Sequence, residues 1–312
     1  MTTLNTVSET VRTRYTKTRL AEREIKILIY LWKWKLVSNA AIAAKFFDGL
    51  SDVRAYNRLR DLKRAGLIKM DDDDEHRHFA WTLTAKGFST VRKYLPGLRE
   101  EGFRSEAFYH DLLVTAFHLG DWLTSPPKTV RFFSEQELRQ SMAVEFPQWV
   151  PAVDVHRPDG YWGFETDGAM APVAIEVEIN RKDPSAYFTV AEYYADYENV
   201  RRIFWLVPTQ KIAAWIQTKL SEALSTKANK HNFIVINDFL KNQWQASICL
   251  GPERNRTVRA TLLTLARETA ENCPRKFSSA KLLETRKSFV RPAACEKSAP
   301  TPNRQPPMAY SQ

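Results

Sequence analysis

The chain has 312 residues and a formal net charge of +10, from 46 basic and 36 acidic side chains, which favours an anionic partner such as nucleic acid. It has no apolar run of membrane-spanning length, no cleavable apolar leader and no Gly-rich phosphate loop, so we expect a cytoplasmic protein with no membrane partner. The three cysteines, Cys249, Cys273 and Cys295, are too widely spaced for a zinc cluster or a disulfide scaffold.

Three helices are expected first along the chain. Apolar residues recur at helical spacing through residues 18–34, and a second helical stretch covers 38–47. After a turn, Ser51 is suited to cap a third helix over 52–64, which Gly66 ends.

The third helix is predicted to have two different faces. We expect its inward stripe to be Val53, Tyr56, Leu59 and Leu62. The outward residues are then Arg54, Asn57, Arg58 and Lys63. Arginine can pair with guanine and asparagine with adenine, so this face is typical of a DNA-recognition helix.

A two-stranded hairpin follows, with strands expected at 67–69 and 79–84. With the helices it resembles a winged helix-turn-helix domain over residues 18–95, down to the phrases Leu-x-x-Leu-x-x-x-Gly-Leu-Ile and Leu-Thr-x-x-Gly. The resemblance implies that the third helix enters the DNA major groove. Four consecutive aspartates at 71–74 would be repelled by phosphate, so we do not expect the wing to lie in the minor groove. A winged domain used for protein contacts is the alternative.

A connecting helix is expected over 104–125. It contains His110-Asp111, which we interpret as a capped or core-satisfied histidine rather than a catalytic one. A further helix start appears at Ser134-Glu135. Glu135 is either a site acid or a partner of that helix's dipole.

Isolated acids mark the second half of the chain. Asp159 precedes a predicted strand at 161–165, and Glu176 and Glu178 interrupt the apolar strand around Ile175 and Val177. Because side chains alternate along a strand, the two glutamates share one face. Carboxylates this close favour a hard cation such as Mg²⁺ between them, so we predict a metal site. The alternative is an edge strand with a solvated acidic face.

Helices and strands alternate after these acids. A helix start at 183–185 leads into a helix through 197, followed by a strand at 201–207, a helix at 209–224 and a strand at 233–236. This order predicts an α/β layer with parallel central strands whose two faces are covered. We therefore assign residues 128–250 to one mixed-sheet domain, within a chain that is α+β as a whole.

The second domain resembles the PD-(D/E)xK nuclease superfamily, with Glu178 standing where the motif has lysine. The resemblance implies Mg²⁺ or Mn²⁺ held by Asp159, Glu176 and the Val177 carbonyl, with Glu178 or Lys182 orienting the attacking water. It also implies an acid from the first helix of the domain, for which Glu135 is the candidate.

Together, residues 18–240 resemble the replication-relaxation family of plasmids and integrative elements and the related MobC-type relaxases. This resemblance implies binding of double-stranded DNA at an origin of transfer or replication, metal-dependent nicking, and other mobilisation or replication proteins as partners. It leaves a homodimer open. The alternatives are a non-enzymatic DNA-binding regulator and a host-defence restriction component. A tyrosine nickase pairing His76 and His78 with Tyr193 and Tyr194 is disfavoured because Arg77 stands between the histidines.

The last segment, 251–312, carries twelve basic and five acidic side chains, a net +7. One helix is expected over 257–271. The Pro-rich stretch beyond about residue 292 lacks apolar periodicity, so it is predicted to be a disordered basic tail.

Overall fold

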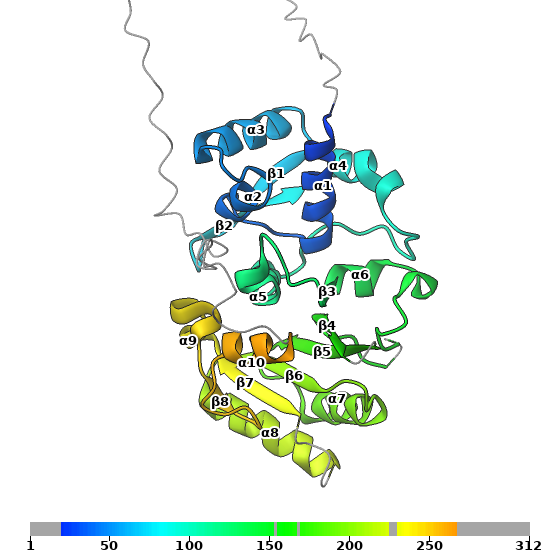
Figure 1. Cartoon of the computed structure of the whole chain (residues 1–312), viewed down its shortest axis with the longest axis vertical. Helices are drawn as coiled ribbons and strands as arrows, with labels where there is room; N and C mark the ends of the chain where they lie inside the picture. The colour runs from blue at the N-terminus through cyan, green and yellow to red at the C-terminus, as the bar shows by residue number, and fades with distance from the viewer. Residues whose placement is uncertain (1–19, 153–154, 167–168, 225–229, 267–312) are drawn as a thin grey trace, which may run out of the picture.

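The computed structural model describes residues 20–152, 155–166, 169–224 and 230–266 (Figure 1). It is a mixed α/β structure in which a helical part with a two-stranded hairpin is packed on a part built around a six-stranded sheet. Within these ranges no helix combines the length and the apolar character needed to cross a membrane.

The first part follows the predicted element order closely. It comprises α1 (Glu22–Trp34), α2 (Asn39–Phe46), α3 (Asp52–Arg64), β1 (Ile68–Asp73), β2 (His78–Leu83) and α4 (Ala85–Val91). The two strands pair antiparallel, with Ile68 opposite Leu83 and Asp73 opposite His78. The hairpin is thus longer than predicted and includes most of the aspartate run.

The predicted inward stripe of α3 is partly wrong. Ala55, Leu59 and Leu62 are buried, whereas Val53 is 44% exposed. Steps of three residues fall short of a full helical turn, so Val53 and Leu62 lie about half a turn apart. The spacing of 55, 59 and 62 keeps one face inward. The predicted Ser51 side-chain cap is also absent, and the Ser51 carbonyl accepts from the Arg54 N–H instead.

Helix α5 (Phe108–Leu119) lies between the two parts, as Figure 1 shows. Every residue from Asp111 to Leu119 is buried, and the Thr115 hydroxyl donates to the Trp34 carbonyl at 2.9 Å. One apolar core runs from α1 through α5 to the sheet. The segment predicted as a connecting helix is therefore shorter than expected and is a core element of both parts.

The sheet has the order β3-β4-β5-β6-β7-β8. Its strands are β3 (Val130–Ser134), β4 (Gly160–Thr166), β5 (Ala169–Val177), β6 (Arg202–Val207), β7 (His231–Val235) and β8 (Ile248–Leu250). The first three strands pair antiparallel, β5 to β7 pair parallel, and β8 returns antiparallel. The prediction of parallel central strands is confirmed for β5, β6 and β7.

Helices cover both faces of this sheet (Figure 1). Ile175 and Val177 of β5 pack toward α5, while Ala174 packs toward α7 (Pro184–Asp196) and α8 (Gln210–Leu224). Asp183 caps α7 as predicted, accepting from the Ser185 N–H at 3.0 Å. Because β5 is central and covered on both sides, the alternative of a solvated edge strand is wrong.

The sheet domain continues beyond residue 250. Three short helices complete it: α6 (Glu135–Gln140), α9 (Ile236–Asn242) and α10 (Val258–Leu265). The Val258 N–H donates to the Ala246 carbonyl at 3.1 Å, and Arg259 pairs with Asp121 at 2.9 Å. Residues 251–266 therefore pack on the same part of the protein as the sheet. The predicted disordered tail lies outside the described residues.

Candidate functional site

Asp159 is held at the point where β4 begins beside β5. Its backbone N–H donates to the Ile175 carbonyl at 3.0 Å, and its Oδ2 accepts from the Val177 N–H at 2.6 Å. Burial opposes ionisation of this carboxyl, but His110 and the Val177 N–H outweigh it and hold the pKa of Asp159 below its usual range. Asp159 is therefore a fixed carboxylate.

His110, in the first turn of α5, faces that carboxylate. Its Nε2 lies 3.1 Å from the Val177 carbonyl oxygen and 3.5 Å from Asp159 Oδ1. Its Nδ1 lies 3.3 Å from Asp111 Oδ1. Both ring nitrogens thus face acceptors, which requires the doubly protonated ring. Burial would lower the pKa of His110, but Asp159 and Asp111 outweigh it and raise the pKa to about 11.

Lys35 brings a second cation from the first part of the chain. It is the C-cap residue of α1, and its side chain is only 5% exposed. Its Nζ lies 3.2 Å from Asp111 Oδ1 and 2.6 Å from Glu135 Oε2. Burial opposes the charge, yet the two carboxylates raise the pKa of Lys35. Burial also raises the pKa of Glu135, and Lys35 offsets this only in part.

The two glutamates of β5 have their own basic partners. Glu176 Oε1 lies 2.7 Å from His156 Nε2 and accepts from the Tyr194 hydroxyl. Burial opposes protonation of His156, but Glu176 raises its pKa. Glu178 follows the last strand residue, and its Oε2 lies 3.1 Å from Lys182 Nζ. Burial raises the pKa of Glu178.

These side chains form what we call the buried acid–base network. Its acids are Asp111, Glu135, Asp159, Glu176 and Glu178, and its bases are Lys35, His110, His156 and Lys182. The network contains all five site residues predicted from the sequence, which are Glu135, Asp159, Glu176, Glu178 and Lys182. Asp159 is close enough to Glu135 and to Lys182 to act on them electrostatically. Such a concentration of perturbed titratable groups is typical of a functional site.

Sequence reasoning missed four members of the network: Lys35, His110, Asp111 and His156. His110 was interpreted as a satisfied histidine of a connecting helix, and the residues that satisfy its Nε2, Asp159 and Val177, come from the sheet domain. A polar pair inside an otherwise apolar helix was the available signal. His156 lies three residues before Asp159 and could also have been suspected from the sequence. Nothing in the sequence around Lys35 indicated its role.

The predicted metal ligands can be tested against this geometry. Their oxygen atoms are of the kind that Mg²⁺ prefers. However, Asp159 and the Val177 carbonyl face His110, and Glu176 faces His156 and Tyr194. No set of three or more His, Cys, Asp or Glu side chains in the described ranges is arranged to hold a metal ion. In this arrangement the residues do not fit a divalent cation.

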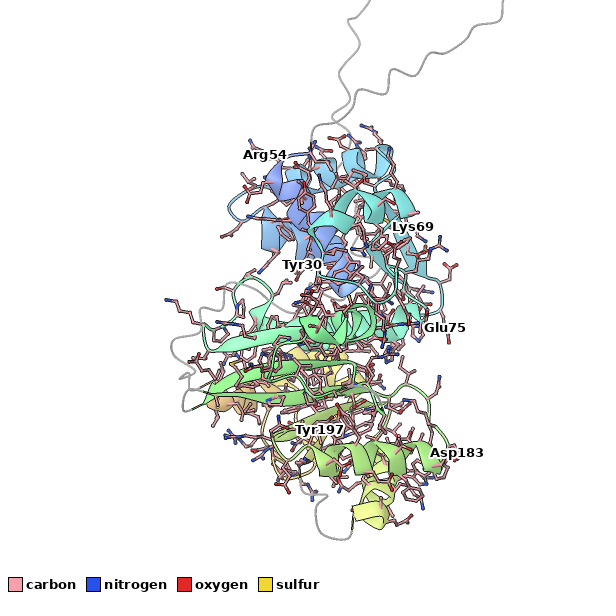
Figure 2. All side chains as sticks on the ribbon, turned by 90° about the vertical axis from the view of Figure 1, so that its right-hand side faces the viewer. Tyr30, Arg54, Lys69, Glu75, Asp183 and Tyr197 are labelled. Carbon is pink, nitrogen blue, oxygen red and sulfur yellow. The ribbon has the colours of Figure 1, made fainter. Side chains whose placement is uncertain are left out.

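The outward face of α3 forms a second candidate surface. Arg54, Asn57 and Lys63 are exposed, and Figure 2 shows Arg54 projecting into solvent at the end of the molecule formed by the first helices. Arg58, predicted to share that face, instead places its Nε 2.9 Å from Glu24 Oε1 of α1. Glu24 is almost fully buried, so Arg58 joins α3 to α1.

The hairpin tip turns toward the second part of the protein. The His76 ring stacks on Tyr109 of α5 with a centroid distance of 3.7 Å (Glu75, beside it, is labelled in Figure 2). The partners proposed for a tyrosine nickase are engaged elsewhere. The Tyr193 hydroxyl donates to the Ala152 carbonyl, and the Tyr194 hydroxyl donates to Glu176. Both tyrosines are buried against the sheet, which argues against an attacking tyrosine.

No family model matches this chain, and neither a curated protein nor a solved structure matches it. The class that the fold defines is therefore a mixed α/β protein with a helical, hairpin-bearing first part and a six-stranded mixed sheet. Any finer assignment depends on the residues and geometry described above.

Proposed function

We propose that this chain binds a specific double-stranded DNA site through α3. The observation that carries the proposal is the exposed part of that helix, where Asn57 stands opposite the buried stripe of Ala55, Leu59 and Leu62 and Arg54 is exposed beside it. Arginine and asparagine are the side chains that read guanine and adenine edges in the major groove. Lys63 is exposed about half a turn away from Arg54, so on this proposal it contacts phosphate rather than a base.

Two apolar side chains support the same surface. Val53 is 44% exposed and Leu50, in the turn before α3, is 39% exposed. Apolar contacts of this kind recognise the methyl group of thymine. Arg58 has the different role of fixing the angle of α3 on α1 through Glu24, so its removal acts on DNA binding only indirectly. The stacking of His76 on Tyr109 agrees with a wing that stays out of the minor groove.

If α3 reads bases, removing one of its base-reading side chains should lower both the affinity for the selected site and the preference for its sequence. On a duplex selected by the wild type from random sequences, Arg54→Ala or Asn57→Ala should each weaken binding by about 1 to 3 kcal/mol and relax base preference. Fluorescence anisotropy at fixed salt measures both effects. Arg201→Ala is the matched control, because Arg201 is also exposed but lies just before β6, in the other part of the protein. Equal affinity of the wild type and the Arg54→Ala/Asn57→Ala variant would contradict the proposal.

A second candidate function is nicking of the bound DNA at an origin of transfer or replication of a mobile element. It is favoured by the order α6, β4, β5, α7, β6, in which the helix that carries Glu135 is followed by an antiparallel hairpin that presents Asp159 and Glu176-x-Glu178, and then by a helix and a parallel strand. This is the order expected of a PD-(D/E)xK core. Five acids in a largely buried network are costly to keep unless they have a use.

Mg²⁺ or Mn²⁺ and other mobilisation or replication proteins belong to this second candidate as its expected cofactor and partners. The present arrangement neutralises the acids with the protein's own bases, so we derive no hydrolytic step through a metal. The same neutralisation is what a non-enzymatic regulator with a nuclease-like domain would show. One assay separates the two.

That assay uses supercoiled plasmid carrying the selected site. If the chain is a nickase, Mg²⁺ or Mn²⁺ should allow the wild type to produce open circular DNA, and Asp159→Asn or Glu176→Gln should abolish this product without weakening binding. Plasmid lacking the site is the control. If tight binding yields no open circular product with either ion, alone or with the accessory proteins of the element, the regulator is the correct reading.

A further inference from the structure

We infer that the imidazole ring of His110 occupies the space beside Asp159 and the Val177 carbonyl that a divalent ion would need in order to bind there, and keeps such an ion out. The inference bears on the metal step of the proposed nicking function. Its test contains no DNA, so it succeeds or fails independently of DNA binding and of cleavage.

The geometry places His110 on the oxygen atoms that a metal would need. Its Nε2 lies 3.1 Å from the Val177 carbonyl oxygen and 3.5 Å from Asp159 Oδ1. Mg²⁺ binds such oxygens at about 2.1 Å and demands near-ideal octahedral directions. An ion that contacted both oxygens along the directions they now present would collide with the ring. The other oxygen of Asp159 is held by the Val177 N–H at 2.6 Å and cannot turn away without breaking that bond.

The ring is also held from behind. Its Nδ1 lies 3.3 Å from Asp111 Oδ1, and the same oxygen lies 3.2 Å from Lys35 Nζ. Lys35 in turn contacts Glu135 at 2.6 Å. Swinging the imidazole away would therefore break contacts on both of its nitrogens and disturb a charge chain that ends in α6. His110 is part of a built position rather than a side chain resting there by chance.

The two glutamates of the network also lie against bases of the protein. Glu176 lies 2.7 Å from His156, and Glu178 lies 3.1 Å from Lys182. The Lys182 side chain is 60% exposed, whereas the side chains of His110 and His156 are only 24% and 15% exposed. Of the two histidines, His110 alone contacts the Asp159 and Val177 oxygens. Removing its ring is therefore the smallest change that frees two oxygen ligands at once.

The test is isothermal titration calorimetry, in which Mn²⁺ is added to the full chain. His110→Ala should bind one Mn²⁺ at least about tenfold more tightly than the wild type, because the ring no longer covers two oxygen ligands. Adding Asp159→Asn to His110→Ala should remove the gained site. His76→Ala, which removes a histidine outside the network, should bind Mn²⁺ like the wild type.

The outcomes decide the inference. His110→Gln replaces His110→Ala if circular dichroism shows that the alanine variant does not fold, since glutamine keeps a donor near the Val177 carbonyl but carries no charge. The inference is overturned if the wild type already binds one Mn²⁺ as tightly as the variant and loses it with Asp159→Asn. It is equally overturned if neither folded His110 variant binds Mn²⁺ more tightly than the wild type.

Discussion

Lys35→Met should lower the free energy of unfolding by about 3 to 5 kcal/mol, the effect expected when one partner of a buried ion pair is removed. The Lys35 and Asp111 side chains are each 5% exposed, and Glu135 is 16% exposed. Methionine fills a similar volume but cannot donate to either carboxylate. Two acids are then left in a medium of low dielectric with one cation fewer.

The measurement is urea unfolding at neutral pH, with Lys26→Met as the matched control. Lys26 lies in the same helix and pairs with Glu22 at 2.7 Å, but both side chains are well exposed, so its loss should hardly change stability. Adding Asp111→Asn and Glu135→Gln to Lys35→Met should recover part of the loss, because the uncompensated charges disappear. Similar losses for Lys35→Met and Lys26→Met would show that the network is not buried as described.

Acid should destabilise the protein through two buried histidines outside the network. His118 and His231 are both fully buried. Burial, with the nearby charges of Lys33 and Lys230 respectively, lowers the pKa of each to about 3. Both are therefore neutral in the folded protein and take up a proton on unfolding once the pH falls below their ordinary value of about 6.5. Their contribution is complete above that value and is lost as the pH falls toward 3.

Each such histidine should cost about 1.4 kcal/mol of stability per pH unit below 6.5. Urea unfolding at pH 7.5, 5.5 and 4.5 measures this slope, and His231→Gln should make it shallower, because only His118 of the pair remains. The carboxylates with lowered pKa values contribute to the wild type and the variant alike, so the difference in slope isolates His231. Parallel slopes would contradict the assignment.

Much of the fold could be predicted because its signals are local. The helical periodicity of residues 18–34, the aspartate before the Pro184 helix and the alternation of helices and strands after Glu178 each act within a few residues of where they appear. The inward face of α3 was predicted less well. A stripe of every third residue includes Val53 but drifts around the helix, whereas the spacing of Ala55, Leu59 and Leu62 stays on one face, and these three residues are buried.

The site was predictable only in part, for a related reason. Asp159, Glu176 and Glu178 are conspicuous because acids interrupt apolar strands. The base that faces Asp159 comes from a distant position, since His110 reaches Val177 across 67 residues, and Lys35 contacts Asp111 across 76. No local pattern carries such a pairing. These bases change what is expected of the site. The acids alone predict an open metal site, whereas the acids together with their bases form ion pairs that leave no open position for a metal.

The central claim, that α3 reads base edges in the major groove, is tested most directly by methylation interference on the selected duplex. Methylation of guanine N7 blocks an arginine contact to that base. We expect wild-type binding to be blocked by methylation of a small set of guanines within one site, and Arg54→Ala to become insensitive at one of them while the others stay unchanged. Wild-type binding that tolerates methylation at every guanine, or an unchanged pattern for Arg54→Ala, would contradict the claim.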